Sequence, residues 1–414
     1  MRTHIKHIMG IAMLLMAALP GSLKAQAQPC DVVTGTVCKS IVTDTVFNPY
    51  VLGVLGNYRA NKAYTYYAAR KEKDPSQPTR IRRDGTFNDF KALWNFKQAK
   101  LKMNADTSRW VWNSEILNFN KRGAELENKD PLGRYNCGLY GYMNNLPVAV
   151  VQNSRYRESA FEGFEDYNLT AYGCTDNCPS TRHIDFSSYS SSIVTDVKHT
   201  GRSSLRINAG DQAGVNFAVL PASVDTLTPQ LIFAMKQNNC AGTVLDNVKS
   251  DSRILIPSFV PVAGSKMVVS AWVKEAQDCK CISYVNNQIV VIVKGPGSTQ
   301  NSYVFNPTGT IIEGWQRCEG VFDIGTDATN VTVSMRSIGS SVVYFDDLRI
   351  HPFNANMKSF VFHPSNLRLM AEMDENNYAT FYEYDAEGTL IRLKKETLRG
   401  IKTIKETRSA LVKQ

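Results

Sequence analysis

The feature that most constrains the fold is a nearly regular series of short strand segments between residues 159 and 352, separated by Gly, Asn, Ser and Pro. Met267–Lys274, Ile289–Val293 and Val331–Met335 are the clearest of these segments. A period of two buries one face of a strand, and turn residues at short intervals join antiparallel neighbours. Helical periodicity is weak, with Phe87–Leu101 the only stretch that could pass for a helix. We therefore expect an all-β chain.

The 414 residues are enough for two or three domains, taking about 150 residues per domain. An N-terminal part rich in Tyr, Trp and Asn precedes the strand-rich middle, and a shorter part with further strands and turns follows it. The expected boundaries are 1–27, 28–158, 159–352 and 353–414. No segment after the N-terminus has the roughly 18 apolar residues of a membrane-spanning helix.

Residues 1–27 have the pattern of a secretory signal peptide. A basic start precedes the apolar run Ile8–Leu19, and Ala25-Gln26-Ala27 is a small-x-small cleavage site. We expect this segment to be removed, with a retained anchor as the alternative. The mature protein is then secreted or lies at the cell surface.

The end of the chain is basic, with eight Lys and Arg residues against two Glu from residue 392 onward. Such a run can bind nucleic acid or anionic envelope polymers. For an exported protein we expect a solvated edge and no nucleic-acid partner.

Export also determines how the nine cysteines are interpreted, because an oxidising compartment favours disulfides over metal ligands. Cys30 could pair with Cys38, and Cys174 with Cys178, across short loops. Cys279 and Cys281 are too close to pair with each other, so each would pair elsewhere, with Cys240 and Cys318 the nearest candidates. Nine is odd, and Cys137 is expected to keep a free thiol. The disulfide candidates are Cys30, Cys38, Cys174, Cys178, Cys240, Cys279, Cys281 and Cys318.

The order of motifs in the middle part is more specific than its alternation. An acidic opening at Phe161–Asp166 is followed by a turn and strand at His199–Ile207 and a Ser-x-Trp-Val strand within Met267–Lys274. A Gly-Trp strand at Gly314–Phe322 and an Asp-Asp strand at Val342–Ile350 close the series. This order resembles the jelly-roll carbohydrate-binding modules of the galactose-binding-like superfamily, over just under half of the chain. The resemblance implies an antiparallel β-sandwich.

In the modules that this chain resembles, a structural calcium ion joins an aspartate of the closing strand to a glutamate near the start of the domain. The matching residues are Glu165 and Asp346, with Glu162 and Asp347 as substitutes. Hard oxygen ligands suit calcium. Strand parity places Asp346 on the face of Tyr344 and Leu348, where an unpaired carboxylate is costly. The alternative is a carboxylate that accepts backbone N–H groups or pairs with an arginine.

Sugar binding needs exposed aromatic rings beside amide and carboxyl groups. Trp272 and Trp315 lie within hydrophobic strands and are expected in the core. The candidates in polar loops are Tyr172, Phe186, Tyr189 and Tyr284.

The flanks carry a second resemblance. Asp374–Arg392 resembles the Tyr-Asp (YD) repeat of RHS-type proteins, and Asp130–Tyr135 with Tyr140–Tyr142 is similar to a degenerate copy. Such repeats are β-hairpins that stack on their neighbours, so two copies cannot wind a shell. We expect a piece of a larger surface-protein architecture, with the jelly roll inserted between hairpins. Two unrelated hairpins are the alternative.

No catalytic motif is found: there is no Gly-x-Ser-x-Gly elbow, His-Glu-x-x-His or phosphate-binding loop. The sequence therefore predicts a noncatalytic adhesion or scaffold protein, with a glycan, an envelope polymer or a protein as its partner. A polysaccharide-active enzyme is the alternative, because glycoside cleavage needs only two carboxylates. The carboxylates near aromatics in the N-terminal part are Glu115, Glu125, Glu127 and Asp130.

Overall fold

The computed structural model describes residues 60–67, 92–97, 100–103, 109–120, 123–169, 182–225, 231–238, 242–250, 259–277, 282–297 and 299–407. The predicted signal peptide and Tyr172 lie outside these ranges. The described residues form antiparallel sheets joined by turns, which confirms the all-β fold. Three short 3-10 helices are η1 (Tyr156–Glu158), η2 (Ser187–Ser192) and η3 (Ala222–Asp225).

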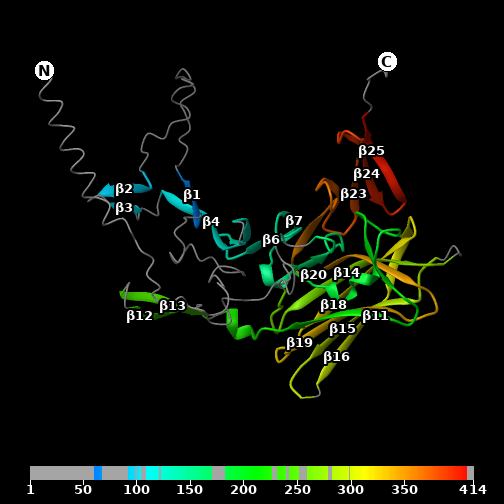
Figure 1. The fold of residues 1–414 in the computed structure, drawn as a ribbon, viewed down its shortest axis with the longest axis horizontal. Helices are drawn as coiled ribbons and strands as arrows, with labels where there is room; N and C mark the ends of the chain where they lie inside the picture. The colour runs from blue at the N-terminus through cyan, green and yellow to red at the C-terminus, as the bar shows by residue number, and fades with distance from the viewer. Residues whose placement is uncertain are drawn as a thin grey trace, which may run out of the picture. The chain divides into compact units, whose positions relative to one another are not determined.

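A β-sandwich is formed by the middle of the chain (Figure 1). Its larger sheet contains β8 (Ala160–Glu162), β9 (Ile193–Val194), β10 (Ser204–Ile207), β14 (Lys266–Glu275), β17 (Pro307–Ile312), β18 (Trp315–Asp323) and β20 (Val343–Pro352). The strand order is β17-β18-β14-β20-β10-β9, with β8 also paired to β20. Its smaller sheet contains β11 (Gln212–Ala218), β15 (Asn287–Lys294), β16 (Gln300–Phe305) and β19 (Asn330–Ser337), in the order β11-β19-β15-β16. Alternating apolar side chains of both sheets, such as Val269, Val291 and Phe345, form the core between them.

A β-bulge in β20 changes the parity of that strand. Between its pairings with Ser270 and Trp272 of β14, β20 has one residue more than its partner. Asp347 lies at the bulge with a φ of 52°. Leu348 consequently faces the core, whereas Asp346 lies on the opposite face, beside Trp272. The prediction that Asp346 shares the face of Leu348 is therefore wrong, because an extra residue inverts the alternation.

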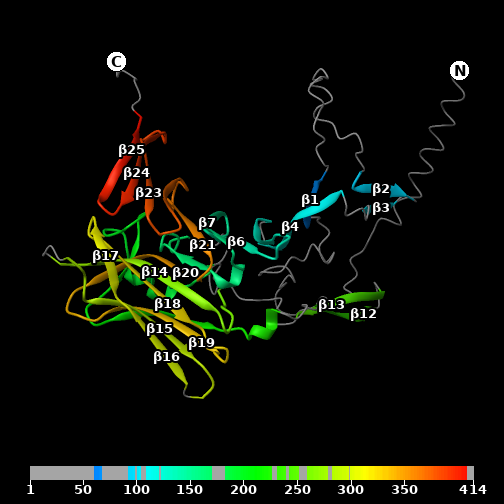
Figure 2. The ribbon, with the colours of Figure 1, turned by 180° about the vertical axis from the view of Figure 1, so that it is seen from behind.

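The second large element is a ten-stranded antiparallel meander (Figure 2). Its strands, in spatial order, are β1 (Lys62–Tyr66), β4 (Trp110–Phe119), β5 (Glu125–Lys129), β6 (Tyr135–Gly141), β7 (Leu146–Gln152), β21 (Asn356–Phe362), β22 (Leu369–Met373), β23 (Ala379–Tyr384), β24 (Leu390–Thr397) and β25 (Gly400–Glu406). β7 pairs directly with β21, for example Val151 with Met357, although the whole sandwich lies between them in sequence. The sandwich is therefore an insertion in a continuous sheet.

Two further hairpins complete the described strands. β2 (Trp94–Lys97) pairs with β3 (Lys100–Met103), so the described part of Phe87–Leu101, the one stretch that could pass for a helix, forms strands. In the sequence of β2, Trp94 and Phe96 alternate with polar residues. β12 (Leu231–Asn238) pairs with β13 (Gly242–Ser250), and this hairpin belongs to a compact unit separate from the one that holds both large sheets.

Candidate functional site

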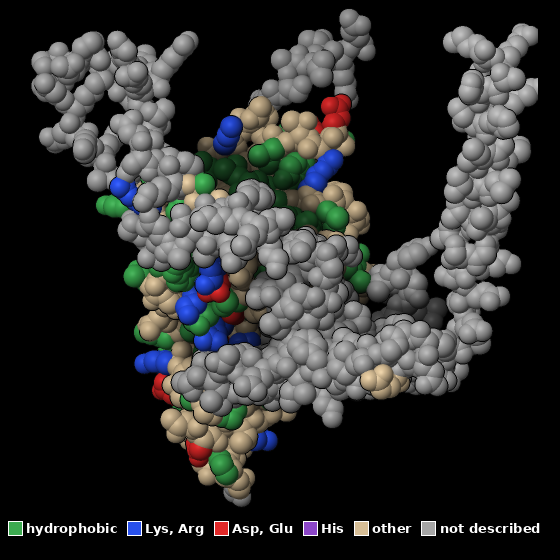
Figure 3. Space-filling model, turned by 90° about the vertical axis from the view of Figure 1, so that its left-hand side faces the viewer, with side chains coloured by type: hydrophobic (Ala, Val, Ile, Leu, Met, Phe, Trp, Pro, Cys, Tyr) green, Lys and Arg blue, Asp and Glu red, His purple; other side chains and the backbone are tan. Residues whose placement is uncertain are grey.

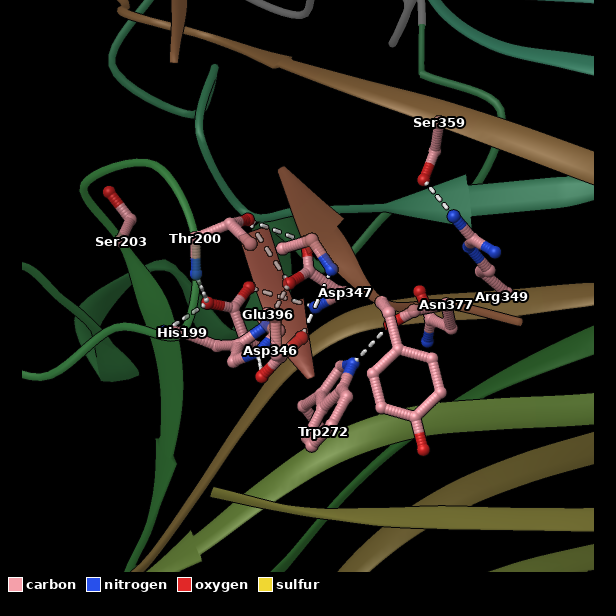
Figure 4. Close-up of polar contacts among 12 residues, drawn as sticks. His199, Thr200, Ser203, Trp272, Asp346, Asp347, Arg349, Ser359, Asn377 and Glu396 are labelled. Carbon is pink, nitrogen blue, oxygen red and sulfur yellow. Dashed lines mark hydrogen bonds and ion pairs between the residues drawn. The ribbon is translucent and has the colours of Figure 1, made fainter. Parts of the chain in front are cut away.

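A buried polar cluster lies where the sandwich meets the C-terminal strands of the meander (Figure 4). His199 is at its centre, with Nδ1 2.7 Å from Oδ2 of Asp347 and Nε2 3.1 Å from Oε1 of Glu396. Thr200 donates its hydroxyl to Asp347 over 2.9 Å. None of these residues is more than 9% exposed. We call His199, Thr200, Asp346, Asp347 and Glu396 the His199 cluster.

A tight turn and the bulge in β20 bring this cluster together. Asp346 accepts the backbone N–H groups of His199, Thr200 and Asp347 over 2.9, 3.3 and 2.8 Å. Gly201 follows in the left-handed conformation, with a φ of 58°, which favours glycine. Consecutive strand residues normally point to opposite faces. The left-handed backbone at Asp347 allows both carboxylates to reach the same turn.

The electrostatics of the cluster depend on its burial. Burial alone lowers the pKa of His199, but hydrogen bonds with Asp347 and Glu396 outweigh it and raise this pKa to about 9. His199 is therefore a buried cation at neutral pH, held between two carboxyl groups. Burial and the nearby charges of Asp347 and Glu165 raise the pKa of Asp346 well above its usual range.

An apolar cluster adjoins the polar one. The rings of His199 and Trp272 stack with centroids 4.4 Å apart, and Nε1 of Trp272 donates to the backbone carbonyl of Asn377 over 2.8 Å. Trp272 and Trp315 are 0% and 4% exposed, so both are buried as predicted. They lie on the outer side of the larger sheet, however, beneath the turn between β22 and β23.

Arg349 connects the same face to the meander a second time. This side chain is 1% exposed and donates to the backbone carbonyl oxygens of Asp374 and Met357 over 2.7 and 3.3 Å. Its other terminal nitrogen donates to Oγ of Ser359 over 2.6 Å. The burial of a charged group is costly unless that group is paired and hydrogen-bonded. The meander therefore seals this part of the outer face of the larger sheet.

The predicted calcium ligands lie around the same turn. Oε1 of Glu165 accepts the N–H groups of Arg202 and Ser203 over 2.6 and 2.8 Å, and its Oε2 is buried without a partner. Both oxygens of Asp346 and of Asp347 already accept hydrogen bonds. In the described part of the chain, no group of three or more His, Cys, Asp or Glu side chains is arranged to hold a metal ion. The structure shows Asp346 bonded to backbone amides, and calcium binding stays a prediction.

Two of the loop aromatics proposed to bind sugar, Phe186 and Tyr284, are buried, and Tyr189 is half-buried. Phe186 is 0% exposed in the sandwich core, and Tyr284 is 8% exposed with its hydroxyl bound to a backbone carbonyl. Tyr189 packs against the same core and also bonds to backbone through its hydroxyl. These loops fold back on the sandwich, so Phe186 and Tyr284 cannot stack on a sugar ring. Tyr172 lies outside the described residues.

The smaller sheet has a polar outer face, which we call the open face. Its side chains point away from the core formed by Ala213, Val291 and Val333. Cross-strand neighbours align them in four rows, one through β11, β19 and β15 and three through all four strands. The apolar members are Gly214, Ala218, Val290, Ile292 and Val304, and the polar members are Gln212, Asn216, Gln288, Lys294, Gln300, Ser302, Asn330, Thr332, Ser334 and Arg336.

The carboxylates that motivated the enzyme alternative each have a partner of their own. The pairs are Glu115 with Lys62, Glu125 with Asn128, Glu127 with the N–H of Tyr156, and Asp130 with Arg134. Glu127 is buried, which raises its pKa above the usual range. These contacts stabilise the local hairpins.

Two cysteines fall within the described residues, and both are free and buried. A free Cys137 agrees with the prediction. Cys318 was expected to form a disulfide, but its Sγ lies 3.4 Å from the carbonyl oxygen of Phe305 in the sandwich core. Cys318 therefore has a free thiol in the structure, and the prediction that it forms a disulfide is wrong. The other seven cysteines lie outside the described residues.

The basic end of the chain is partly neutralised where it is described. Arg392 contacts Glu383 and Glu406, and Lys394 also contacts Glu383. In Figure 3, basic and acidic side chains are interspersed over the described part of that view. Within the described ranges, no helix is long and apolar enough to span a membrane.

Comparison with known proteins gives matches in structure alone. No family model and no curated protein matches the sequence. A Family 16 Carbohydrate Binding Module-2 is 12% identical over 38% of this chain and 82% of its own length, with a TM-score of 0.22. The CBM22-1 xylan-binding domain of Paenibacillus barcinonensis Xyn10C is 9% identical over 39% and 78%, with a TM-score of 0.23. TmCBM61, solved with β-1,4-galactotriose, is 13% identical over 37% and 74%, with a TM-score of 0.18. Because these TM-scores are low, the fold assignment rests on the strand order and registers described above.

Sequence reasoning missed the centre of the buried cluster. His199 stood in a recognised turn, but nothing local marks Glu396, on β24, as its partner. An isolated acidic residue within the basic run from residue 392 onward was the one available signal.

Proposed function

We propose that this chain is a noncatalytic, secreted or cell-surface protein whose jelly roll binds an oligosaccharide on the open face. The carrying observation is that the two outer sides of the sandwich differ. Around Trp272 and Arg349 the larger sheet is sealed by the meander, whereas the smaller sheet presents a row of polar side chains. The sequence resemblance to carbohydrate-binding modules supports a glycan as the occupant.

The chemistry of the open face suits a neutral polyhydroxylated ligand. Its polar groups are mainly amides and hydroxyls, which both donate and accept hydrogen bonds as sugar hydroxyls do. The hydroxyl of Thr332 donates to Oδ1 of Asn216 over 2.8 Å, so one sugar hydroxyl could contact both side chains. Arg336 adds a guanidinium group whose Nε is buried without a partner, and Lys294 adds an exposed ammonium group.

The sealed face suggests what the meander contributes. Because the sandwich is inserted between β7 and β21 and tied down by the His199 cluster, it is held in one orientation. A rigid insertion in a continuous sheet suits a scaffold that displays a binding face. The RHS-type resemblance of the flanking hairpins supports the same interpretation and stays a prediction.

A glycan array of the mature protein tests the proposal, with and without chelator. We expect retention of a neutral polysaccharide that falls at least about tenfold in Asn216→Ala and in Thr332→Val. Asn356→Ala, an exposed amide on β21, is the matched control and should bind as the wild type does. Binding to no glycan, or equal binding by all variants, would refute the open face as the site.

The enzyme alternative has its own measurement. Release of reducing ends from a polysaccharide panel, lost on mutating one Glu or Asp, would replace the noncatalytic proposal.

A further inference from the structure

The sandwich carries exposed aliphatic side chains at the end where β14 stops and β15 begins. Ile282 and Val285, in the loop between these strands, are 95% and 71% exposed. Ile338, directly after β19, is 51% exposed, and its N–H donates to the carbonyl oxygen of Asn286 over 2.9 Å. The two loops are therefore neighbours, and their aliphatic side chains lie at the same end of the sandwich.

The turn between β24 and β25 adds a fourth aliphatic side chain to this end, beside β17 (Figure 2). Leu398, in the turn, is 61% exposed. A Cβ on Gly400 would lie 3.7 Å from Oε1 of Glu313, which stands between β17 and β18. The carbonyl oxygen of the next residue, Gly314, accepts the hydroxyl of Tyr284 over 2.7 Å. We call the four aliphatic residues Ile282, Val285, Ile338 and Leu398 the apolar tip.

Buried polar contacts hold the loop between β14 and β15 in place. Tyr284 is 8% exposed, and its N–H donates to Oε1 of Gln316 over 2.8 Å. Glu275 is 2% exposed and accepts the N–H and the side-chain amide of Asn286 over 2.6 and 2.9 Å. Because these anchors fix the loop, its aliphatic residues are held in contact with solvent. Contiguous exposed apolar patches commonly mark a contact with a membrane or with another protein.

Cations lie beside the apolar tip on the outer face of the larger sheet. Lys274 and Arg206, near the ends of β14 and β10, flank Tyr344 in register. A Cβ on Gly314 would lie 3.2 Å from Nζ of Lys274, which places this cation at the same turn. Neither cation has an ion-pair partner among the described residues.

The hairpin of β24 and β25 adds further cations. Lys395 and Lys402 are directly opposite each other and exposed, and Arg399 lies in the turn. Like charges directly opposite each other destabilise a sheet, so an anionic partner would relieve this repulsion. The carboxylates on the described loops of this end are Asp211 and Glu313, so positive charge predominates around the apolar tip.

We propose that the apolar tip inserts into the surface of an anionic phospholipid membrane. Proteins that lie on a membrane place aliphatic side chains at the boundary of headgroups and acyl chains, and cations at the anionic headgroups. The apolar tip supplies the first feature, and the surrounding lysines and arginines supply the second. The cations favour lipid over a second copy of this chain, because the tip of that copy would carry the same charge. This inference assigns a second partner, away from the open face, and does not depend on glycan binding.

Matched serine variants test the aliphatic contribution. Leu398→Ser is compared with Leu132→Ser, at a leucine that is 76% exposed in the turn between β5 and β6. Val285→Ser is compared with Val150→Ser on β7, where the valine is 44% exposed. Surface substitutions usually change stability little, so all four variants should melt close to the wild type.

A further pair tests the contribution of charge. Lys274→Gln removes a cation beside the apolar tip. Lys266→Gln, at the opposite end of the same strand β14, is the matched control.

Co-sedimentation of the mature protein with vesicles provides the measurement, with phosphatidylserine in phosphatidylcholine compared with phosphatidylcholine alone. We expect binding to the vesicles that contain phosphatidylserine, and weaker binding at high salt. Leu398→Ser and Val285→Ser should each weaken binding about tenfold. Lys274→Gln should weaken it about fivefold. The three control variants and the open-face variant Asn216→Ala should bind as the wild type does.

No binding to either kind of vesicle would overturn the proposal, as would equal binding by the tip variants and their controls. Self-association that Val285→Ser abolishes, without vesicle binding, would assign the apolar tip to a contact between copies of the chain and would also overturn it. Because these vesicles carry no sugar, the glycan array tests the open face independently of either result.

Discussion

His199 and Glu396 are 197 residues apart in the sequence, yet Nε2 of the first lies 3.1 Å from Oε1 of the second. Asp347 lies on the other ring nitrogen at 2.7 Å. The three side chains connect the turn before β10, the bulge of β20, and β24. This buried charged group joins the sandwich to the distal half of the meander, so changes within it should affect both.

Removing Glu396 should destabilise the protein strongly. Glu396→Ala leaves the His199 cation with a single carboxylate and frees the backbone N–H of Ala379, which now donates to Glu396 over 3.0 Å. Breaking a buried ion pair costs about 3–5 kcal/mol. Glu406→Ala on the neighbouring β25, whose ion pair with Arg392 is solvent-exposed, should cost less than about 1 kcal/mol. Chemical denaturation compares the two, and equal losses would contradict a structural role for the cluster.

Stability should fall as the pH rises from about 6.5 to about 9. The folded pKa of His199, about 9, lies above its unfolded value, so its contribution is complete below pH 6.5 and is lost as the pH rises through 9. Glu162 and Glu165, with folded pKa values of about 8, act in the same direction. His183 has an opposite effect, but only below its unfolded pKa.

Urea unfolding at several pH values between 6.5 and 9.5 measures this slope. His199→Gln should flatten it, whereas His363→Gln, at a half-buried histidine whose pKa is lowered by partial burial, should leave it unchanged. A wild-type free energy of unfolding that does not fall over this interval would show that His199 is not charged in the folded state.

The hydrogen bond from Trp272 to the turn between β22 and β23 should matter more than the area of its ring. Trp272→Phe leaves the buried carbonyl of Asn377 unpaired, which typically costs about 1–3 kcal/mol. Trp315→Phe makes the same reduction in ring size within the same apolar cluster without breaking this bond. Thermal melting should therefore rank Trp272→Phe as the less stable variant. The reverse order would mean that packing dominates at this contact.

The sheets could be predicted from sequence because each strand carries its own signal. Met267–Lys274 and Ile289–Val293 alternate locally, and the structure places strands β14 and β15 there. The flanking turns at Gly388 and Gly400 are likewise local and have φ values of 92° and 106°. Alternating strands and glycine turns, which depend on a few consecutive residues, could therefore be predicted.

The site could not be predicted in the same way, because its contacts are distant in sequence. The pairing of His199 with Glu396 depends on the order of strands in the meander. The bulge at Asp347 inverts the parity of β20, and an extra residue leaves no trace in an alternating pattern. Phe186 and Tyr284 stand among polar residues, so the sequence gives no sign that their loops fold onto the core.

The cysteines should yield three disulfides and three free thiols. Cys137 and Cys318 are buried and free, and burial raises the pKa of the Cys318 thiol to about 12, so neither should react while the protein is folded. The remaining seven of the nine cysteines are an odd number, which leaves at least one more unpaired. Alkylation under native and then denaturing, nonreducing conditions, followed by peptide mapping, counts them. A mapped disulfide that contains Cys318 would contradict the structure.

Asp346 should be structural whether or not calcium binds nearby. Its carboxyl group accepts three backbone N–H groups, from residues 199, 200 and 347, and Asp346→Ala would leave all three buried without a partner. At roughly 1 kcal/mol or more for each group, the variant should lose about 3 kcal/mol of stability. Calorimetry of the wild type and the variant, with calcium and with chelator, separates the two roles. If calcium uses Glu165 and Asp346, chelation should lower the melting temperature of the wild type and leave the variant unchanged, because a bound ion stabilises the folded state alone. If chelation changes neither, Asp346 acts through its backbone hydrogen bonds, and a variant that melts like the wild type would refute that role as well.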